Sequence, residues 1–176
     1  NNFLSNLRAP LVVLNQLLQG QGGNAAESVG RFAVNTTAGV FGIIDVAEKI
    51  GLEEKEEDFG QTLATWGVGD GFYLVLPIFG PSNLRDSAGM VLTYSTDPIN
   101  LYAVREGEAW LVPLRVATNA VDQRSKIIDE VNAMRDNSVD YYATVRSSYY
   151  QNRKAAIQNI DDTELTPLPL ISVEFE

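Results

Sequence analysis

Apolar side chains that recur every three or four residues predict a helix at the start of the chain. These residues are Phe3, Leu4, Leu7, Leu11, Leu14 and Leu18. Such spacing places them on one face of a helix. Proline suits a first helical turn and disrupts a helix interior, so Pro10 predicts a break and a restart, and Gly20 predicts the end. Arg8 is the only charged residue of this segment.

A second helix is predicted further along, where Asn24 and Glu27 have the spacing of a capping box. The apolar stripe that follows consists of Val29, Phe32, Ala33, Thr36, Val40 and Ile44. No charged residue lies between Phe32 and Ile44. Two interpretations fit this uncharged window: a helix buried in the core, or a helix that faces lipid or a neutral polar channel.

The middle of the chain joins an acidic run to an apolar segment rich in glycine. Residues 53–58 predict a solvated loop, and Asp58 can cap a short helix that starts at Phe59. The segment 67–81 shows neither helical nor two-residue periodicity, and glycine and proline interrupt it throughout. We predict a mobile apolar loop here, because glycines free its entry and Pro77 prevents a helix. The alternative is a fixed loop in the core.

Three more helices are predicted in the second half of the chain. Ser82 can cap a helix that ends at the sequence Thr96-Asp97-Pro98. Apolar spacing predicts long amphipathic helices over 114–131 and 142–160, with Asn137 or Ser138 as the cap between them. Strand patterns are scarce, so the predicted fold class is all-α. The expected organisation is one helical domain over residues 1–160 and an acidic, proline-containing tail over 161–176, extended or disordered.

Composition narrows the possible chemistry. The 176 residues are 45% hydrophobic and 20% charged, which indicates a globular protein and excludes intrinsic disorder. There is no cysteine and no histidine, which excludes disulfides, zinc fingers, thiol nucleophiles and serine–histidine–aspartate triads. No run approaches the roughly 18 apolar residues of a spanning helix. Asn1 does not begin a signal peptide, so we expect any targeting segment to lie upstream.

The net charge of −10 is concentrated in two segments. The run Glu-Glu-Lys-Glu-Glu-Asp at 53–58 contributes −4, and residues 161–176 contribute −5. We expect both segments to face water, because placing such charge in hydrocarbon is costly. The chain has no basic stripe, and affinity for nucleic acid depends on lysine and arginine. No nucleic-acid partner is therefore expected.

Several motifs invite a catalytic or binding interpretation that their context does not support. Gly67, Gly69 and Gly71 suggest a phosphate loop, but no Gly-Lys-Ser/Thr follows them. The glycosylation sequon at 35–37 lies inside a helical stripe. Carboxylates that could serve acid–base or magnesium chemistry are Asp45, Glu48, Asp58, Asp70 and Asp86. No spacing singles out a pair, so we expect helix caps and salt bridges, with no catalytic residue and no metal site.

Long stretches of the first half resemble one known family. They are residues 2–7 (NFLSNL), 30–47 (GRFAVNTTAGVFGIIDVA), 57–63 (EDFGQTL), 66–82 (WGVGDGFYLVLPIFGPS) and 84–86 (LRD). This order of glycines, Tyr73 and Pro77 resembles the MlaA/VacJ family of outer-membrane phospholipid-transport lipoproteins. Phe72 stands where the family pattern has proline. The family-motif residues are Asn2, Phe3, Asp45, Phe59, Gly60, Leu84, Arg85 and Asp86.

The resemblance implies a ring-like arrangement of amphipathic helices in the periplasmic (inner) leaflet of the outer membrane of a Gram-negative bacterium. It implies a polar channel that passes mislocalised outer-leaflet phospholipids to a periplasmic lipid carrier (MlaC-like) and so maintains lipid asymmetry. It also implies an outer-membrane porin as partner, a lipid-anchor cysteine outside this sequence, no cofactor and no enzymatic activity. The alternatives are a helical scaffold without a channel and a carboxylate-dependent lipid hydrolase.

Physical chemistry explains why such a protein would be apolar outside and polar within. Exposing two acyl chains to water costs on the order of 20 kcal/mol, at about 0.8 kcal/mol per methylene. A charge in hydrocarbon costs at least about 2.5 to 3.5 kcal/mol. Neutral polar residues could line the channel: Asn15, Gln16, Gln19, Asn35, Thr36 and Thr37. The apolar loop could gate it through Gly67, Gly69, Gly71, Phe72, Tyr73, Leu74, Leu76, Pro77 and Phe79.

Overall fold

The computed structural model describes residues 2–160, except the side chains at positions 123, 126 and 130. The helices are α1 (Asn2–Leu18), α2 (Gly22–Thr37), α3 (Val46–Lys49), α4 (Phe59–Thr65), α5 (Leu84–Thr96), α6 (Pro98–Arg105), α7 (Leu111–Lys126), α8 (Ile128–Asn137) and α9 (Tyr141–Gln158). A single two-stranded sheet, β1 (Tyr73–Leu76) with β2 (Gly80–Asn83), interrupts them in the described part. The all-α fold class is confirmed. The expected tail at 161–176 lies outside the described residues.

The N-terminal helices differ from prediction at two points. The expected break at Pro10 is wrong, because α1 runs through it without interruption. An interior proline costs about 3 kcal/mol, but α1 packs against both α2 and α4, and those contacts hold the helix together. The capping box at Asn24 is also wrong. Helix α2 starts three residues earlier than predicted, with Gln21 instead of Asn24 at the N-cap position and no side-chain hydrogen bond there.

The uncharged window does not form one helix to Ile44, because α2 ends at Thr37. The chain then turns through Val40, Phe41 and Gly42, all with positive φ. A Cβ atom on Gly42 would lie 2.4 Å from that of Asn6, so only glycine fits against α1 here. The turn exposes large apolar side chains, with Phe41 71% exposed. A fully buried core helix is therefore ruled out for the second half of this window.

The segment 67–81 is not an irregular loop throughout, because its second part, from Tyr73, belongs to a β-hairpin that ends at Asn83. The strands pair antiparallel, with Tyr73 opposite Asn83 and Leu76 opposite Gly80. Its tip is a γ-turn, since the Phe79 amide donates to the Pro77 carbonyl at 2.8 Å and Ile78 has a φ of 70°. Sequence periodicity missed the hairpin because the strands have only four residues each.

Asp58 caps α4 by accepting from the Gln61 amide, as predicted. Helix α5 ends at Thr96 as expected, but its cap is Asn83 and not Ser82. The Asn83 side chain accepts from the Asp86 amide at 2.7 Å. Ser82 lies in β2, and its hydroxyl forms a hydrogen bond of 3.0 Å with the hydroxyl of Ser87.

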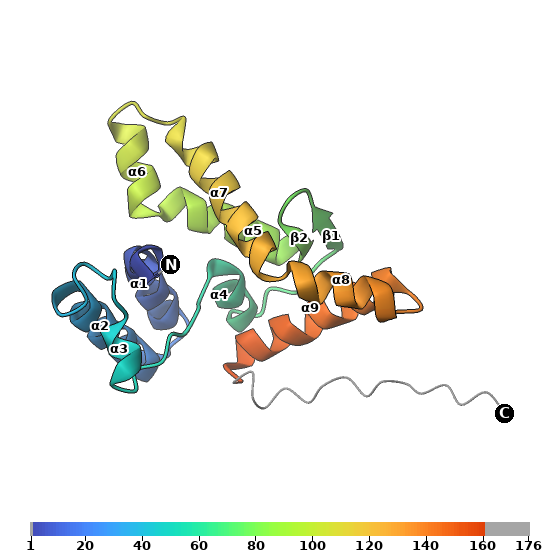
Figure 1. Ribbon diagram of the computed structural model, residues 1–176, viewed down its shortest axis with the longest axis horizontal. Helices are drawn as coiled ribbons and strands as arrows, with labels where there is room; N and C mark the ends of the chain where they lie inside the picture. The colour runs from blue at the N-terminus through green and yellow to red at the C-terminus, as the bar shows by residue number, and fades with distance from the viewer. Residues whose placement is uncertain (1, 161–176) are drawn as a thin grey trace.

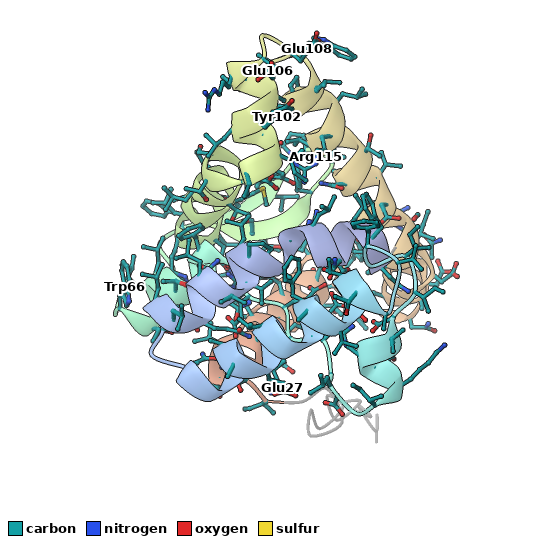
Figure 2. All side chains as sticks on the ribbon, turned by 90° about the vertical axis from the view of Figure 1, so that its left-hand side faces the viewer. Glu27, Trp66, Tyr102, Glu106, Glu108 and Arg115 are labelled. Atoms are coloured by element: carbon teal, nitrogen blue, oxygen red, sulfur yellow. The ribbon has the colours of Figure 1, made fainter. Side chains whose placement is uncertain are left out.

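The C-terminal half contains one helix that the pattern did not predict. This is α6, whose N-cap Asp97 accepts from the amides of Ile99 and Asn100. The single helix expected over 114–131 is instead divided at Ile127 into α7 and α8. The cap of α9 is Asp140, since neither Asn137 nor Ser138 reaches its first turn. The side chain of Arg115, a residue of α7, lies between α6 and α7 (Figure 2). It joins the two helices through an ion pair with Asp97, the N-cap residue of α6.

Figure 1 shows α1, α2 and α3 on one side, α8 and α9 on the other, and α4 between them. The α6–α7 pair rises above this layer, and α5 connects α6 to the hairpin. Figure 2 shows Glu106 and Glu108 at the tip of that pair and Trp66 at an outer edge. No helix in the described range is both long enough and apolar enough to span a bilayer.

Burial in this fold is inverted relative to an ordinary soluble domain. Apart from Leu11, the fully buried apolar residues of the described chain are alanines. The largest completely buried side chains are Gln16, Asn15, Asn83 and Thr62. Large apolar residues lie outside instead, including Leu17, Val91, Tyr102, Trp110 and Val121, each at least 59% exposed. Exposed apolar surface on this scale marks contact with lipid or with another protein.

Candidate functional site

A cavity of about 470 Å³, lined by many polar side chains and by apolar ones such as Leu11, Phe79 and Met90, lies between the helices. Its wall combines α1, the segment 54–58, α4, the hairpin, α5, α7 and α9. The polar residues of the wall include Arg8, Asn15, Glu57, Asp58, Gln61, Asp86, Thr93, Tyr94, Asp97, Asn119, Tyr149 and Arg153. Small-molecule sites typically enclose about 300 to 1,000 Å³, so the cavity can hold a small polar group.

An ionic cluster centred on Arg153 forms one part of the wall. The guanidinium donates to both carboxylate oxygens of Asp58, at 2.8 and 2.7 Å, and to Oδ1 of Asp86 at 3.0 Å. Its Nε also lies 2.7 Å from Oδ2 of Asp86, an ion pair without hydrogen-bond geometry. The cluster therefore joins α9 to the start of α4 and to α5.

Two more side chains complete the cluster around Asp86. Arg85 donates through Nε to Asp86 at 2.9 Å and pairs with Asp70 before the hairpin. The Tyr149 hydroxyl donates to Asp86 at 2.5 Å. Burial and this hydrogen bond raise the pKa of the Tyr149 phenol well above its usual range, so it stays a donor.

Burial alone would raise the pKa of the Asp58 carboxyl. The hydrogen bonds and positive charge of Arg153 outweigh that effect and lower the pKa below its usual value. Asp58 is thus held as a carboxylate, with both oxygens used by Arg153 and one also by the Gln61 amide.

Two glycines allow α4 and α5 to approach closely beneath the cluster. A Cβ atom on Gly89 would lie 2.3 Å from the backbone nitrogen of Gly60. A Cβ atom on Gly60 would lie 2.4 Å from Nη2 of Arg153 and 2.7 Å from Oδ1 of Asp86. The two positions therefore need glycine for space, not for backbone conformation.

The predicted family-motif residues fall into three places. Phe59, Gly60, Arg85 and Asp86 lie at or beside the ionic cluster, and Leu84 contacts the Gly71 backbone position. Asp45 caps α3 and pairs with Arg31. Asn2 borders a small hollow beside Asn6, Arg31 and Asn35, whereas Phe3 is exposed.

Asn35 and Thr36, predicted to line the channel, are bonded to the protein scaffold. Asn35 Oδ1 accepts from the amides of Val46 and Ala47, each at 2.9 Å, and its Nδ2 donates to Asp45. Thr36 accepts from Asn6 at 3.0 Å. Neither is among the residues that line the larger cavity, where Asn15 and Gln61 supply neutral polar groups instead.

The predicted gate residues are divided between the cavity, the interior and the outer surface. Phe79 lines the cavity, and Tyr73 packs among Tyr142, Tyr149 and Tyr150. Phe72 points outward at 76% exposure, and Leu74, Leu76 and Pro77 stay on the hairpin without lining the cavity. Gly67 and Gly71 have positive φ, whereas Gly69 does not.

Sequence reasoning did not identify Arg8, Glu57, Tyr149 or Arg153 as site residues. Glu57 lies at the end of a run expected to be solvated, yet it is only 8% exposed. The exposed part of that run is limited to residues such as Glu53, Glu54 and Glu56. One signal was available: Arg8 is the only charge on an otherwise neutral helix.

Comparison with known proteins shows that the chain is similar to the members of one family. Residues 1–156 match the model of the family described as MlaA lipoprotein. An uncharacterised protein of Rickettsia prowazekii is 38% identical over 159 residues, which cover 90% of this chain and 62% of that protein. The chain thus spans about three fifths of the length of such curated relatives.

Two further relatives carry a functional name, "Intermembrane phospholipid transport system lipoprotein MlaA". The one from Haemophilus influenzae is 33% identical and covers 84% of this chain and 58% of its own length. The one from Escherichia coli is 34% identical, with 86% and 59% covered. A solved structure concerned with the maintenance of bacterial outer membrane lipid asymmetry matches with a TM-score of 0.72 and 31% identity, covering 89% of this chain and 77% of its own.

Proposed function

The chain belongs to the MlaA lipoprotein family, and on that premise we propose that it acts in intermembrane phospholipid transport. Mislocalised phospholipids of the outer leaflet pass through the polar cavity toward a periplasmic carrier. This removal maintains the lipid asymmetry of the outer membrane.

The inverted burial of the fold carries this proposal. A phospholipid in transit needs polar surroundings for its headgroup and hydrocarbon for its chains. The cavity wall offers arginines, carboxylates and amides, whereas the outer surface exposes residues such as Val91, Tyr102 and Trp110. Lipid around the outside can therefore solvate the chains while the headgroup passes through the cavity.

The exposed apolar surface also supports a proposal for where the whole protein lies and which partners it contacts. We place it in the periplasmic leaflet of a Gram-negative outer membrane, held beside a porin and delivering lipid to an MlaC-like carrier. The exposed apolar residues on α5, α6 and α7 supply surface for lipid and porin. The acidic tip at Glu106 and Glu108 is suited to water, and so to the periplasmic side.

Blocking the cavity tests the proposal directly. Thr93→Trp places a bulky side chain at a cavity-lining position of α5, and we expect it to reduce phospholipid transfer by about tenfold or more, since transfer depends on an open passage. The measurement is the initial rate of labelled phospholipid transfer from vesicles that contain the full-length protein to a periplasmic carrier.

Val91→Trp is the matched control, because Val91 lies two residues away on α5 and is 66% exposed. It adds a larger apolar side chain to the outer surface and should leave transfer unchanged. A scaffold without a channel would tolerate both substitutions. Normal transfer by a folded Thr93→Trp variant would contradict the proposal.

We also propose that the hairpin gates the cavity. Phe79 reaches the cavity wall from one side of the strained tip, and Phe72 and Ile78 point outward. A β-branched residue with positive φ, such as Ile78, stores about 1 to 3 kcal/mol. Such strain is consistent with a hairpin that has two arrangements.

Gly69→Ala is the sharpest test of the gate. Gly69 lies at the entry to the hairpin without positive φ, and a methyl group added there would meet nothing within 4 Å, so alanine restricts the backbone without a clash. We expect folding stability within about 0.5 kcal/mol of the original and a transfer rate changed several-fold. Gly51→Ala, equally open but with positive φ and far from the hairpin, reports the effect of strain alone. An unchanged rate in Gly69→Ala would remove the gate.

A further inference from the structure

The two sides of α9 differ in their chemistry. Tyr149, Arg153 and Ala156 line the cavity that we assign to transport. The other side of the helix lines a second hollow, open to the surroundings and also of about 470 Å³. The residues of this outer α9 face are Tyr142, Ala143, Arg146, Ser147, Tyr150, Gln151 and Lys154. None of them lines the transport cavity, so the outer α9 face is a separate surface.

The outer α9 face is basic, although the chain as a whole is acidic. Helix α9 contains three basic residues and no acidic one, whereas the net charge of the chain is −10. Arg153 is paired with carboxylates of the cavity wall. Arg146 and Lys154 are exposed, and no carboxylate in the described part of the chain forms an ion pair with either. An anionic group would complement both.

Two tyrosine rings hold the guanidinium of Arg146. Its Cζ atom lies 5.6 Å from the ring centre of Tyr73 and 5.9 Å from that of Tyr150. The two ring centres are 6.0 Å apart. Stacking of this kind is worth about 0.5 to 1 kcal/mol at an exposed site, and it uses the face of the guanidinium and not the N–H groups on its edge. Arg146 is therefore ordered before a ligand binds, which lowers the entropic cost of binding.

The surroundings of Arg146 favour a phospholipid headgroup as the ligand. Tyrosine, arginine and lysine together are typical of the boundary between hydrocarbon and water. The ring of Tyr142, a residue that is 56% exposed, lies 5.7 Å from the ring of Tyr73 in the hairpin. Val75 is on the same side of β1 as Tyr73 and is 62% exposed. Exposed apolar surface thus continues from the hairpin to the basic residues, as a phosphate attached to acyl chains requires.

We propose that the outer α9 face binds the phosphate of a phospholipid in the surrounding leaflet, with Arg146 as the main donor and Lys154 as a second positive charge. The N–H groups of a guanidinium form a fork that matches two phosphate oxygens. Lys154 lies about two helical turns from Arg146, so it attracts the headgroup as a point charge. This lipid anchors α9 at the membrane surface and is distinct from the lipid in transit. The inference rests on the proposed membrane location.

A fluorophore beside Arg146 tests the site. The 176 residues contain no cysteine, so Ala143→Cys supplies a thiol on the outer α9 face. The labelled full-length protein is placed in mixed micelles of a non-ionic detergent and phosphatidylcholine with a nitroxide on its headgroup, and quenching is measured against lipid content. Arg146→Gln should raise the lipid content at half-maximal quenching about tenfold, the effect of losing one hydrogen bond to a charged group. Lys154→Gln should raise it about twofold.

Four controls separate this site from other causes of quenching. Arg105→Gln removes an exposed charge at the end of α6 and should leave the quenching curve unchanged. Arg146→Lys keeps the charge without the fork, so its curve should lie between those of the original protein and Arg146→Gln. The protein without Ala143→Cys measures background labelling. Loss of quenching in Thr93→Trp would show that the quenching lipid lies in the transport cavity, and would overturn the proposal.

Unlabelled competitors identify the bound chemistry. Phosphatidylglycerol should displace the nitroxide lipid, and diacylglycerol with the same acyl chains should do so about tenfold less well, because it has no phosphate. Equal competition by diacylglycerol would overturn the phosphate role. Equal displacement by inorganic phosphate would assign the site to free phosphate and not to a lipid. Absence of quenching, with a fluorescence change only when the porin or the carrier is added, would assign the face to a protein partner.

Failure of this inference is distinct from failure of the proposed function. An unchanged quenching curve in Arg146→Gln would reject the headgroup site, while lipid transfer to the carrier would still test transport. Conversely, absence of transfer by the original protein would reject transport, and quenching at Ala143→Cys would still report binding at the outer α9 face.

Discussion

Replacing Arg153 by methionine is expected to lower the free energy of unfolding by about 2 kcal/mol at neutral pH. This is less than the roughly 3 to 5 kcal/mol for breaking a fully buried ion pair, because the Asp58 side chain is 40% exposed and water screens its charge. The guanidinium is the common partner of Asp58 and Asp86, and its removal leaves two carboxylates facing each other between α4, α5 and α9. Methionine retains the apolar length of the side chain, so the lost charge dominates. Denaturant unfolding of the full-length protein in detergent, followed by circular dichroism, measures the change.

The loss should depend on pH with a definite sign. Arg153 holds the pKa of Asp58 below its usual value, so the pair stabilises the fold above about pH 4, and that stability is lost as the pH falls through the lowered pKa. In the variant, burial remains but Arg153 no longer opposes it, so acidification neutralises the isolated carboxylate. The difference between the two proteins should therefore shrink from pH 7 to pH 3.

Lys154→Met is the matched control for this prediction. Lys154 is the next residue of α9 and is exposed, so the substitution also removes one positive charge but touches no buried partner. It should cost less than about 0.5 kcal/mol. Equal effects of the two substitutions would show that net charge, not the cluster, determines stability.

Gly89→Ala is expected to destabilise the protein by about 3 kcal/mol, through overpacking rather than loss of an interaction. The added methyl group would lie 2.3 Å from the backbone nitrogen and 2.6 Å from the Cα of Gly60, and a backbone cannot move aside as a flexible side chain can. Helices α4 and α5 must then separate, which also displaces Asp58 and Asp86 from Arg153. Unfolding midpoints and lipid transfer should both decrease.

Gly30→Ala makes the same chemical change as Gly89→Ala but is expected to stabilise the protein. Gly30 lies inside α2, and a Cβ atom there would meet nothing within 4 Å. Alanine should stabilise the helix by about 0.5 to 1 kcal/mol. If Gly89→Ala behaved like Gly30→Ala, the close packing of α4 on α5 would not exist in solution.

Local signals predicted the parts of the fold that local interactions decide. Asp58 caps α4 because its side chain reaches an amide three residues ahead, and helix α5 ends before Pro98 because the residue before a proline avoids helical backbone. The same kind of reasoning missed Asp140, where three nearby residues could each serve as a cap. Choosing among them requires the path of the chain between α8 and α9.

The remaining features depend on contacts between distant residues. Helix α1 continues through Pro10 because neighbouring helices hold it, and the hairpin is extended by a bond from the Leu84 amide to the Phe72 carbonyl. Arg153 meets Asp58 across 95 residues of sequence, a distance at which spacing carries no information. The sequence could therefore not predict most of the cavity wall. Of the polar α1 residues expected to line a channel, Asn15 is on this wall, whereas Gln16 and Gln19 are not.

The polar interior also changes which substitutions evolution can accept. In an ordinary domain, core residues exchange for others of similar size, since dispersion and burial have no direction. Here the interior positions, such as Asn15 and Thr62, meet each other through a hydrogen bond of 2.8 Å with fixed donor and acceptor. Such positions can change only together. The outer surface requires only apolar character. We therefore expect apolar residues to replace one another there during evolution, while the interior residues stay nearly fixed.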